Sequence, residues 1–327
     1  MNRRKFLQHS GRTLAAVPMY SLASGLVSAG CTEAPAPAAA PAVSADVMNR
    51  IAMTTVCLRS MFPKSMNLPG VSGDGGTLTL LQSPKFMADT FGIHTVETWN
   101  WQFAEQTMDY CQQLKAAAAA AGSKFNNLQL DLGPEDNLSD PDASKRAATI
   151  KIMKEWIDRT ATIGATSMRA NTGFGTEANW NLQRTAAGFK ELTDYGKTKG
   201  VMILIENHIG YGESIDRVVE IIKAVNDPNC RAICDWGNTP ANGTPPQKID
   251  ALAKLFPYLH LVSAKQLDFD ANNQHISYDI VPIIQATEAS GFKGVDSIEF
   301  YTEKAHPTDY VAALKEEQRL LAANIKA

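Results

Sequence analysis

Residues 201–208 read VMILIENH: five apolar residues lead directly into a carboxylate, an amide and an imidazole. A strand that is buried on both faces, as in a parallel sheet covered by helices, has a continuous apolar run of this kind. The polar residues Glu206, Asn207 and His208 then lie at the carboxyl end of the strand, where parallel α/β folds place their sites. The stretch predicts a buried parallel strand with functional groups at its end.

The same pattern recurs along the chain, and helical patterns separate its copies. The apolar runs cover residues 53–58, 95–98, 128–132, 167–169, 201–205, 232–234, 259–264 and 295–298. The polar residues near their ends are Arg59, Glu97, Asp131, Arg169, Glu206, Asp235, Lys265 and Glu299, at intervals of 29 to 38 residues. Segments such as 142–163, 179–199 and 215–225 place apolar residues at helical spacing between them. Eight strand–helix units of this size predict an α/β fold of the (β/α)8 TIM barrel type.

A doubly wound parallel sheet is the alternative architecture. Such a fold often has a glycine-rich nucleotide loop after its first strand, and residues 70–76 read GVSGDGG. This stretch lacks both the GxGxxG and the GxxxxGK spacing. We interpret it as a flexible loop after the first strand of a barrel.

The N-terminal residues resemble an export signal. Arg3 and Arg4 precede a moderately apolar run, as in twin-arginine signal peptides, and residues 28–31 read SAGC, which resembles a lipoprotein cleavage site. We expect a signal peptide at 1–30, a Pro/Ala tether at 31–45 and the barrel at 46–327. These features predict an exported bacterial protein, periplasmic or tethered to the membrane by a lipid on Cys31. A membrane-spanning anchor is the alternative, which the short Ala/Gly/Ser-rich run disfavours.

The charge balance limits the possible partners. The formal net charge is −3 over 327 residues, and basic residues do not cluster in the part expected to fold. A nucleic-acid-binding protein would carry a basic patch, so we expect no nucleic-acid partner. The expected partner is instead a small molecule.

Three acids end the strands expected at positions five, six and eight. Glu206 shares strand parity with Met202 and Leu204, and His208 continues it, so both can face the barrel mouth. Asp235 and Glu299 end their runs in the same way. Three carboxylates at one buried mouth repel one another unless a cation lies among them, and hard divalent ions prefer oxygen ligands. The alternative is that each acid caps a helix or pairs with a surface lysine.

Two basic residues also end strands. Lys265 shares parity with Ser263 on the seventh run and could steady a carboxylate or polarise a carbonyl oxygen in catalysis. Arg169 ends the fourth run, and a planar guanidinium suits an anionic or hydroxyl-rich substrate. A solvated lysine and a structural ion pair are the respective alternatives.

Further residues are candidates for substrate binding. Glu97 and Trp99 lie in the segment VETWNW, where a sugar face could stack on an indole while the acid holds hydroxyl groups. Core packing of the tryptophan is the alternative. His208 and Asn238, each a few residues beyond a strand end, complete the expected substrate-binding set.

Taken in order, several stretches resemble the xylose-isomerase-like barrel superfamily of sugar phosphate isomerases and epimerases. They are GIHTVETW, NLQLDLG, KEWIDRTATIGATSMRANTG, VMILIENHIG, AICDWGN, LVSAKQLDFD and VDSIEFY. The resemblance extends over residues 50–320, in a branch with SAK-x-x-DFD on the seventh strand.

The resemblance implies a divalent metal, Mn, Mg, Co or Zn, held by Glu, Asp, His and Glu on strands five to eight. The matching positions here are Glu206, Asp235 and Glu299, and Ser263 stands where the histidine is expected. The two glutamates are implied to move protons on either side of a sugar carbon. Glu206, Glu299 and Lys265 are therefore the candidate catalytic residues.

Three functions remain open on this reading. The first is an exported metal-dependent isomerase or epimerase that removes a proton next to a sugar carbonyl. The second is a lyase that performs β-elimination on a 3-keto-glycoside through the same carbanion. The third is a periplasmic sugar-binding barrel without catalysis.

Overall fold

The computed structural model describes residues 43–63, 76–238, 240, 242–300 and 307–326. The predicted signal peptide, its cleavage site, most of the tether and most of the glycine-rich loop lie outside these residues. Residues 43–327 form one compact unit. None of the helices in the described ranges combines the length and the apolar composition that a membrane crossing requires.

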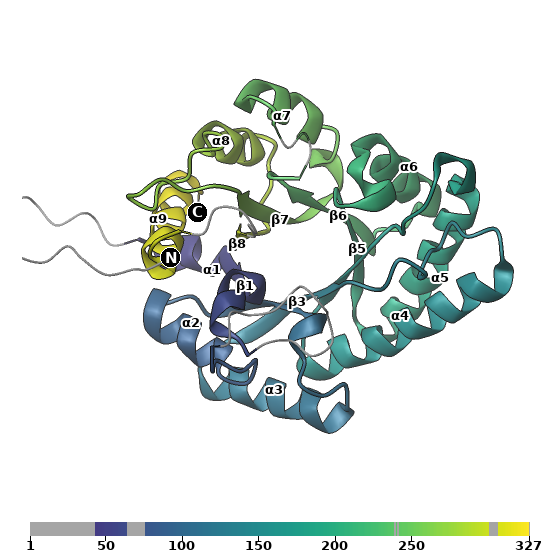
Figure 1. Cartoon of the computed structure of the whole chain (residues 1–327), viewed down its shortest axis with the longest axis horizontal. Coiled ribbons are helices and arrows are strands. Elements are labelled where there is room, and N and C mark those ends of the chain that lie inside the picture. The colour runs from purple at the N-terminus through teal and green to yellow at the C-terminus, as the bar shows by residue number, and fades with distance from the viewer. Residues whose placement is uncertain (1–42, 64–75, 239, 241, 301–306, 327) are drawn as a thin grey trace, which may run out of the picture. The chain divides into compact units, whose positions relative to one another are not determined.

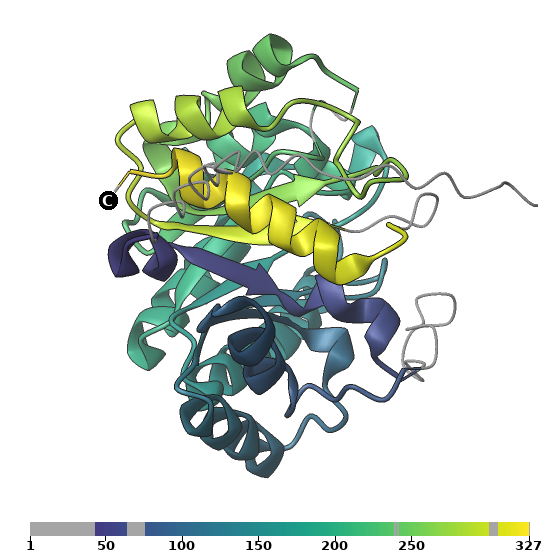
Figure 2. The same cartoon turned by 90° about the vertical axis from the view of Figure 1, so that its left-hand side faces the viewer.

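Eight parallel strands pair in chain order and close into a barrel, because β1 pairs with β8 through Ile51 and Asp296. Figure 1 looks down the barrel with the helices around it, and Figure 2 shows it from the side. The strands are β1 (Ile51–Thr54), β2 (Thr95–Trp99), β3 (Lys124–Leu130), β4 (Ser167–Ala170), β5 (Met202–Glu206), β6 (Cys230–Asp235), β7 (Leu259–Gln266) and β8 (Val295–Phe300). The predicted (β/α)8 barrel is confirmed.

Helices connect the strands and cover the outside of the barrel. They are α1 (Ala45–Asn49), α2 (Ser83–Phe91), α3 (Met108–Ala120), α4 (Ala143–Ile163), α5 (Leu182–Lys199), α6 (Ile215–Val225), α7 (Pro245–Leu252), α8 (Val281–Ala289) and α9 (Tyr310–Asn324). Asp142 caps the start of α4, and Gly164 and Gly200 end α4 and α5 in the left-handed conformation that glycine adopts readily. The helical segments expected at 142–163, 179–199 and 215–225 correspond to α4, α5 and α6.

The first strand is shorter than the apolar run suggests. β1 ends at Thr54, and residues Thr55–Met61 form a 3-10 helix. The hydroxyl of Thr54 accepts a hydrogen bond from the backbone N–H of Val56, which starts this helix, and Cys57 and Leu58 are buried within it. The strand expected at 53–58 is therefore wrong from Thr55 onward, because a buried helical turn and a buried strand give the same apolar run.

The interior of the barrel is divided into an apolar half and a polar half. Leu204, Ile233 and Leu261 form a separate apolar cluster that packs against Met202, inside β5 to β7. On the other strands several residues of inward parity are polar and fully or almost fully buried: Thr54, Glu97, Asn127, Gln129, Ser167 and Ser297. Hydrogen bonds join several of them, including Asn127 to Glu97 at 2.6 Å and Ser167 to Asn127 at 2.8 Å. A polar interior of this kind supports the charged groups that lie above it at the mouth.

The two ends of the barrel chain meet on the face opposite the mouth. Arg50, just before β1, donates hydrogen bonds to both carboxylate oxygens of Glu288, at 2.6 and 3.1 Å, and to the carbonyl of Lys326 at 2.8 Å. Asp296, at the start of β8, lies 3.6 Å from the same guanidinium. The last helix, α9 (yellow in Figure 2), packs on β8 and β1. These contacts close the ring where its first and last units meet.

Candidate metal and active site

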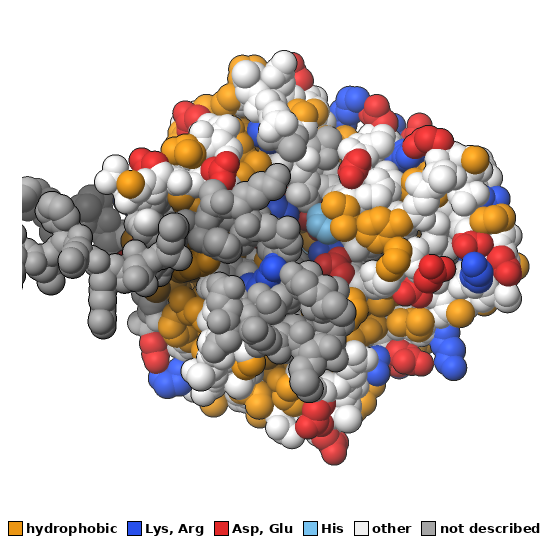
Figure 3. All heavy atoms as spheres, viewed as in Figure 1, with side chains coloured by type: hydrophobic (Ala, Val, Ile, Leu, Met, Phe, Trp, Pro, Cys, Tyr) orange, Lys and Arg blue, Asp and Glu red, His pale blue; other side chains and the backbone are white. Residues whose placement is uncertain are grey.

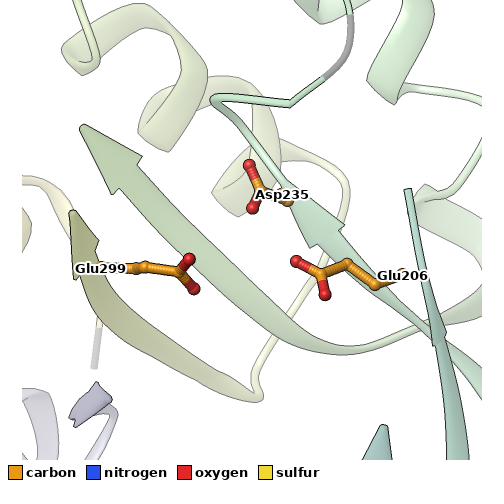
Figure 4. Close-up of side chains that lie close together, drawn as sticks. All are labelled: Glu206, Asp235 and Glu299. Carbon is orange, nitrogen blue, oxygen red and sulfur yellow. The ribbon is translucent and has the colours of Figure 1, made fainter. Parts of the chain in front are cut away.

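Glu206, Asp235 and Glu299 converge at the carboxyl ends of β5, β6 and β8. Each offers one carboxylate oxygen, and these three oxygens lie within 4.8 Å of one another. The three side chains are almost fully buried, at 4, 0 and 5% exposure. In Figure 4 the carboxyl groups of Glu206 and Glu299 point toward one another, with Asp235 between them on one side. Glu206 faces the barrel mouth as its strand parity predicts, and the structure brings the three acids together as one cluster.

Lys265 on β7 lies between two of these acids. Its ammonium nitrogen is 3.0 Å from Oε1 of Glu299 and 3.4 Å from Oδ2 of Asp235, and the side chain is 8% exposed. Burial alone lowers the pKa of Lys265, but the carboxylates of Asp235 and Glu299 outweigh it and hold this pKa above its ordinary value. The lysine is therefore a fixed positive charge within the acidic cluster.

The two glutamates lie in different environments. Oε2 of Glu299 accepts hydrogen bonds from the hydroxyl of Ser263 at 2.8 Å and from the amide of Gln129 at 3.3 Å. Burial raises the pKa of Glu299, but Lys265 and Ser263 lower it below the usual range. Burial raises the pKa of Glu206 well above that range, against the opposing effect of Arg169. Two acids whose pKa values are pushed apart are suited to act as base and acid.

Asp235 is held by the turn that follows it. Its Oδ1 accepts from the backbone N–H groups of Gly237 at 2.7 Å and Asn238 at 2.9 Å, and its Oδ2 accepts from the side-chain amide of Asn238 at 2.8 Å. Burial raises the pKa of Asp235 against the effect of Lys265. Asn238, expected to bind substrate, is half-buried and has its amide engaged with this carboxylate.

A second network surrounds Arg169 at the end of β4. Its guanidinium lies 3.0 Å from Oε2 of Glu206, outside hydrogen-bonding geometry, and donates to Asp131 and to Oδ1 of Asn171. Asp131 also accepts from Asn171 at 2.7 Å and from the indole N–H of Trp99 at 2.7 Å. Burial raises the pKa of Asp131, but Arg169 outweighs it and lowers that pKa below its usual range. Arg169 therefore stabilises both an acid of the cluster and the neighbouring strand end.

Trp99 and Glu97 lie deeper than a sugar-stacking pair would. Trp99 is 8% exposed, and its indole N–H is bound to Asp131. Glu97 is fully buried, accepts from Asn127 at 2.6 Å, and has no hydrogen-bond partner for Oε2 among the described residues. Burial raises its pKa to about 7. Both residues support the strand ends beneath the mouth.

His208 is half-buried beside the cluster. Its Nδ1 is buried, and the described part of the chain supplies no hydrogen-bond partner for it. Burial and the nearby Arg169 lower the pKa of His208 to about 3, so the imidazole is neutral at physiological pH. On the face seen in Figure 1, Figure 3 shows basic and acidic side chains and a histidine near the centre, with hydrophobic side chains next to them. A neutral imidazole at such a mouth can donate or accept a hydrogen bond from a sugar hydroxyl.

The loop at residues 208–211 packs against the loop at residues 173–176 so closely that no side chain fits at Gly210. The N–H of Tyr211 donates to the carbonyl of Gly173 at 3.1 Å, and the hydroxyl of Tyr211 donates to the carbonyl of Thr176 at 3.1 Å. Gly210 has a φ of +76°, and a Cβ there would lie 2.3 Å from the carbonyl oxygen of Gly173 and 3.0 Å from the ring of Phe174. This contact fixes the loop that begins at His208.

The donor set fits a hard divalent cation. All three ligand candidates are buried carboxylates, and Oε2 of Glu206 accepts no hydrogen bond from the described residues. Among the described residues, the three acids have two ion-pair partners, Arg169 beside Glu206 and Lys265 beside Asp235 and Glu299. A cation among the oxygens relieves this excess of negative charge. The residues Glu206, Asp235 and Glu299 would hold it.

Several residues of the site were missed or undervalued in the sequence. Gln129 and Ser263 both donate to Glu299, Asn171 binds Asp131, and Asn207 binds the backbone of Asp235. A usable signal existed for two of them. Gln129 has the same parity as Asp131, and Ser263 the same parity as Lys265, so polar residues within apolar runs mark the inward face.

Comparison with known proteins identifies the family. The sequence profile of the xylose isomerase-like TIM barrel matches residues 87–323, and the chain belongs to this family. No curated protein matches the sequence. The coarse prediction from the sequence motifs is thereby confirmed.

Solved structures of similar fold include sugar epimerases. An L-ribulose 3-epimerase is 15% identical with a TM-score of 0.64, over 84% of this chain and 94% of its own. A 3-keto-D-glucoside 4-epimerase from E. coli is 12% identical with a TM-score of 0.58, over 84% of this chain and 99% of its own. A xylose isomerase-like barrel from Mycobacterium smegmatis, solved in complex with magnesium, is 15% identical with a TM-score of 0.60, over 85% and 97%. At these identities the likeness concerns the fold.

Proposed function

We propose that this protein is a metal-dependent sugar isomerase or epimerase that transfers a proton at the carbon next to a sugar carbonyl. The observation that carries this proposal is the placement of Glu206 and Glu299 on opposite sides of one buried cluster, with Asp235 between them. Two carboxyl groups that face each other can remove a proton from one face of a carbon and return one to the other face. Sugar epimerases among the structures of similar fold support the substrate class.

Each residue of the cluster has a defined part in this reaction. Glu299, whose Oε1 lies 3.0 Å from the Lys265 ammonium and whose Oε2 accepts a hydrogen bond from Ser263, accepts the proton from the carbon, and Glu206 donates a proton on the other side. Lys265 and His208 bind oxygen atoms of the substrate next to the reacting carbon. A bound divalent cation supplies electrostatic stabilisation of the negative charge that develops on the carbonyl oxygen.

Exchange of a carbon-bound hydrogen with solvent tests the proposal. The protein, purified without chelator, is incubated in D₂O with D-fructose, L-ribulose or a 3-keto-glucoside, and deuterium in the sugar is measured by NMR. We expect deuterium next to the carbonyl of at least one sugar, and Glu299→Gln lowers the rate by roughly 10²- to 10⁴-fold. Glu191→Gln, on the outer face of α5, is the matched control and retains the full rate.

Two outcomes would contradict the proposal. Undiminished exchange in the Glu299→Gln variant would remove this residue from the mechanism. Tight sugar binding in calorimetry without any deuterium exchange would instead identify a non-catalytic sugar-binding barrel.

A lyase acting on a 3-keto-glycoside is a second candidate, and the position of Lys265 favours it. After Glu299 removes the proton next to the carbonyl, the electron pair can form a carbon–carbon double bond and expel the glycosidic oxygen. The ammonium of Lys265, 3.0 Å from Glu299, can protonate that oxygen as it leaves. Release of the free alcohol together with an unsaturated keto-sugar indicates the lyase, and an epimer with an intact glycosidic bond indicates the epimerase.

Export is part of the proposal, supported by the N-terminal sequence. An arginine pair and a cysteine after a small-residue stretch fit a twin-arginine signal with a lipidation site at Cys31. Replacing Arg3 and Arg4 by lysine is expected to keep the protein in the cytoplasm, and Cys31→Ala to release it from the membrane fraction. Unchanged fractionation of both variants would contradict export by this route.

A further inference from the structure

Lys265 and a divalent cation would share the same carboxyl groups. The ammonium lies 3.0 Å from Oε1 of Glu299 and 3.4 Å from Oδ2 of Asp235, and both acids belong to the three-carboxylate cluster. A lysine in contact with two of three metal-binding carboxylates neutralises part of their charge before any metal arrives. It also repels a second cation at the same place.

The position of Lys265 is built into the fold. Its side chain runs across Gly237, where a Cβ would come within 2.9 Å of both Cγ and Cδ of the lysine. Its backbone carbonyl accepts a hydrogen bond from the hydroxyl of the buried Tyr278. Lys265 also pairs directly with Glu299 in the β7–β8 register. The ammonium is therefore directed at the acids by the backbone and by the absence of a side chain at Gly237.

The protein itself also supplies partners for the carboxylate oxygens of Glu299 and Asp235. Ser263 and Gln129 donate to Oε2, while Lys265 lies at Oε1, so both oxygens of this carboxylate are engaged by the protein itself. Asp235 likewise has both oxygens hydrogen-bonded by Gly237 and Asn238. The cluster can thus keep its shape without a metal.

We propose that Lys265 is a built-in cation that shares the carboxylates of Asp235 and Glu299 with the metal, so that the site stays assembled when empty and binds the divalent ion weakly and exchangeably. This inference rests on the proposed metal-dependent function, because it concerns the same three carboxylates. It goes beyond that function by assigning Lys265 the role of setting the affinity for the metal.

Metal affinity measured directly tests this role. Full-length protein is stripped with chelator and titrated with Mn²⁺, and free Mn²⁺ is followed by electron paramagnetic resonance. We expect Lys265→Met to bind Mn²⁺ at least tenfold more tightly than the unaltered protein, and Lys265→Gln to bind it more tightly as well. Lys254→Met, which removes a surface lysine paired with Asp216, is the matched control and leaves the affinity unchanged.

Thermal unfolding provides a second readout that does not depend on affinity fitting. Without metal, Lys265→Met is expected to melt at a lower temperature, because three acids then face one another without their ammonium. Saturating Mn²⁺ is expected to raise the melting temperature more in this variant than in the unaltered protein.

The outcomes separate this inference from the proposed function. If the unaltered protein binds Mn²⁺ and exchanges deuterium but both Lys265 variants bind Mn²⁺ equally or less tightly, the role of Lys265 is overturned and the function stands. If no variant binds Mn²⁺ while deuterium exchange persists, both the role of Lys265 and the metal requirement are overturned, and proton transfer remains.

Discussion

The side chain of Asn207 and the backbone of Asp235 exchange two hydrogen bonds, each 2.8 Å long. Asn207 follows β5 directly and is fully buried, so it joins the end of β5 to the end of β6. Asn100, which follows β2, makes the same pair of 2.8 Å bonds with the backbone of Asp131 beyond β3. In both cases an asparagine after one strand fixes the residue whose carboxylate enters the mouth from the next strand.

Replacing Asn207 should therefore weaken metal binding although its side chain is not a ligand. Asn207→Ala leaves an N–H and a carbonyl of Asp235 unpaired in a buried position, and we expect roughly 10- to 100-fold weaker Mn²⁺ binding. Asn100→Ala, which acts on Asp131 instead, is expected to leave Mn²⁺ affinity within about twofold and to lower sugar binding. Equal losses of Mn²⁺ affinity in both variants would show that Asn207 does not act specifically through Asp235.

Removing Arg169 should destabilise the protein strongly. Arg169→Met leaves the half-buried carboxylate of Asp131 and the buried carboxyl group of Glu206 without their counter-ion, and removing one partner of a buried ion pair costs about 3–5 kcal/mol. The free energy of unfolding in urea measures this loss. The double variant Arg169→Met/Asp131→Asn is expected to recover part of the lost stability, since Asp131 then carries no charge. Strictly additive losses of the two substitutions would argue against coupling between Arg169 and Asp131.

Asp296 should make stability depend on pH. It is buried, its Oδ2 has no hydrogen-bond partner among the described residues, and burial raises its pKa from 3.8 to about 8. The folded protein thus retains a proton that the unfolded chain releases above pH 4, so this stabilisation is complete below pH 4 and is lost as the pH rises through 8. Asp296→Asn should remove this dependence, worth about 1.4 kcal/mol per pH unit within the window.

Urea unfolding of both proteins at pH 5.5, 7.0 and 8.5 checks this expectation. The variant should gain stability relative to the unaltered protein as the pH rises, because it carries no acid to ionise. Parallel pH profiles of the two proteins would mean that Arg50, 3.6 Å away, keeps Asp296 ionised throughout.

Two glycines of similar backbone conformation should differ in their tolerance of alanine. Gly210 and Gly200 have φ values of +76° and +71°, but a Cβ at Gly210 meets the carbonyl of Gly173 whereas at Gly200 it meets nothing within 4 Å. Gly200→Ala should lower the free energy of unfolding by about 1 kcal/mol, because only the left-handed backbone is strained. Gly210→Ala should lower the free energy of unfolding further. It should also raise the KM for the sugar, because the added methyl group displaces the loop that begins at His208. Equal melting temperatures and KM values in the two variants would contradict this assignment.

Much of the fold follows from the sequence, because buried parallel strands leave a continuous apolar run. Six of the expected strands match the observed ones to within two residues at each end, while β3 begins four residues and ends two residues before the expected run, and the inward parity of Glu206 and Lys265 holds. The error at β1 arose because a buried 3-10 helix continues the same apolar run. Strand periodicity therefore located the acids at strand ends without indicating how their carboxyl groups are bound.

The contacts within the site could not be predicted in the same way. The donation of Trp99 to Asp131 and of Ser263 to Glu299 depends on the register of neighbouring strands. That register shifts between β2 and β3 and again between β6 and β7. A one-residue shift changes which side chains face each other, and a single sequence does not encode it in any visible pattern.

The bond between Arg50 and the carbonyl of Lys326 places the beginning and the end of the barrel within one side chain's reach. A few added residues could join them, and the polypeptide could be cut instead at Gly164 or Gly200, where helices end on the face away from the mouth. Such a circularly permuted protein would keep every strand-end acid in its place. The order in which the eight units are synthesised is, for this architecture, independent of the chemistry they assemble.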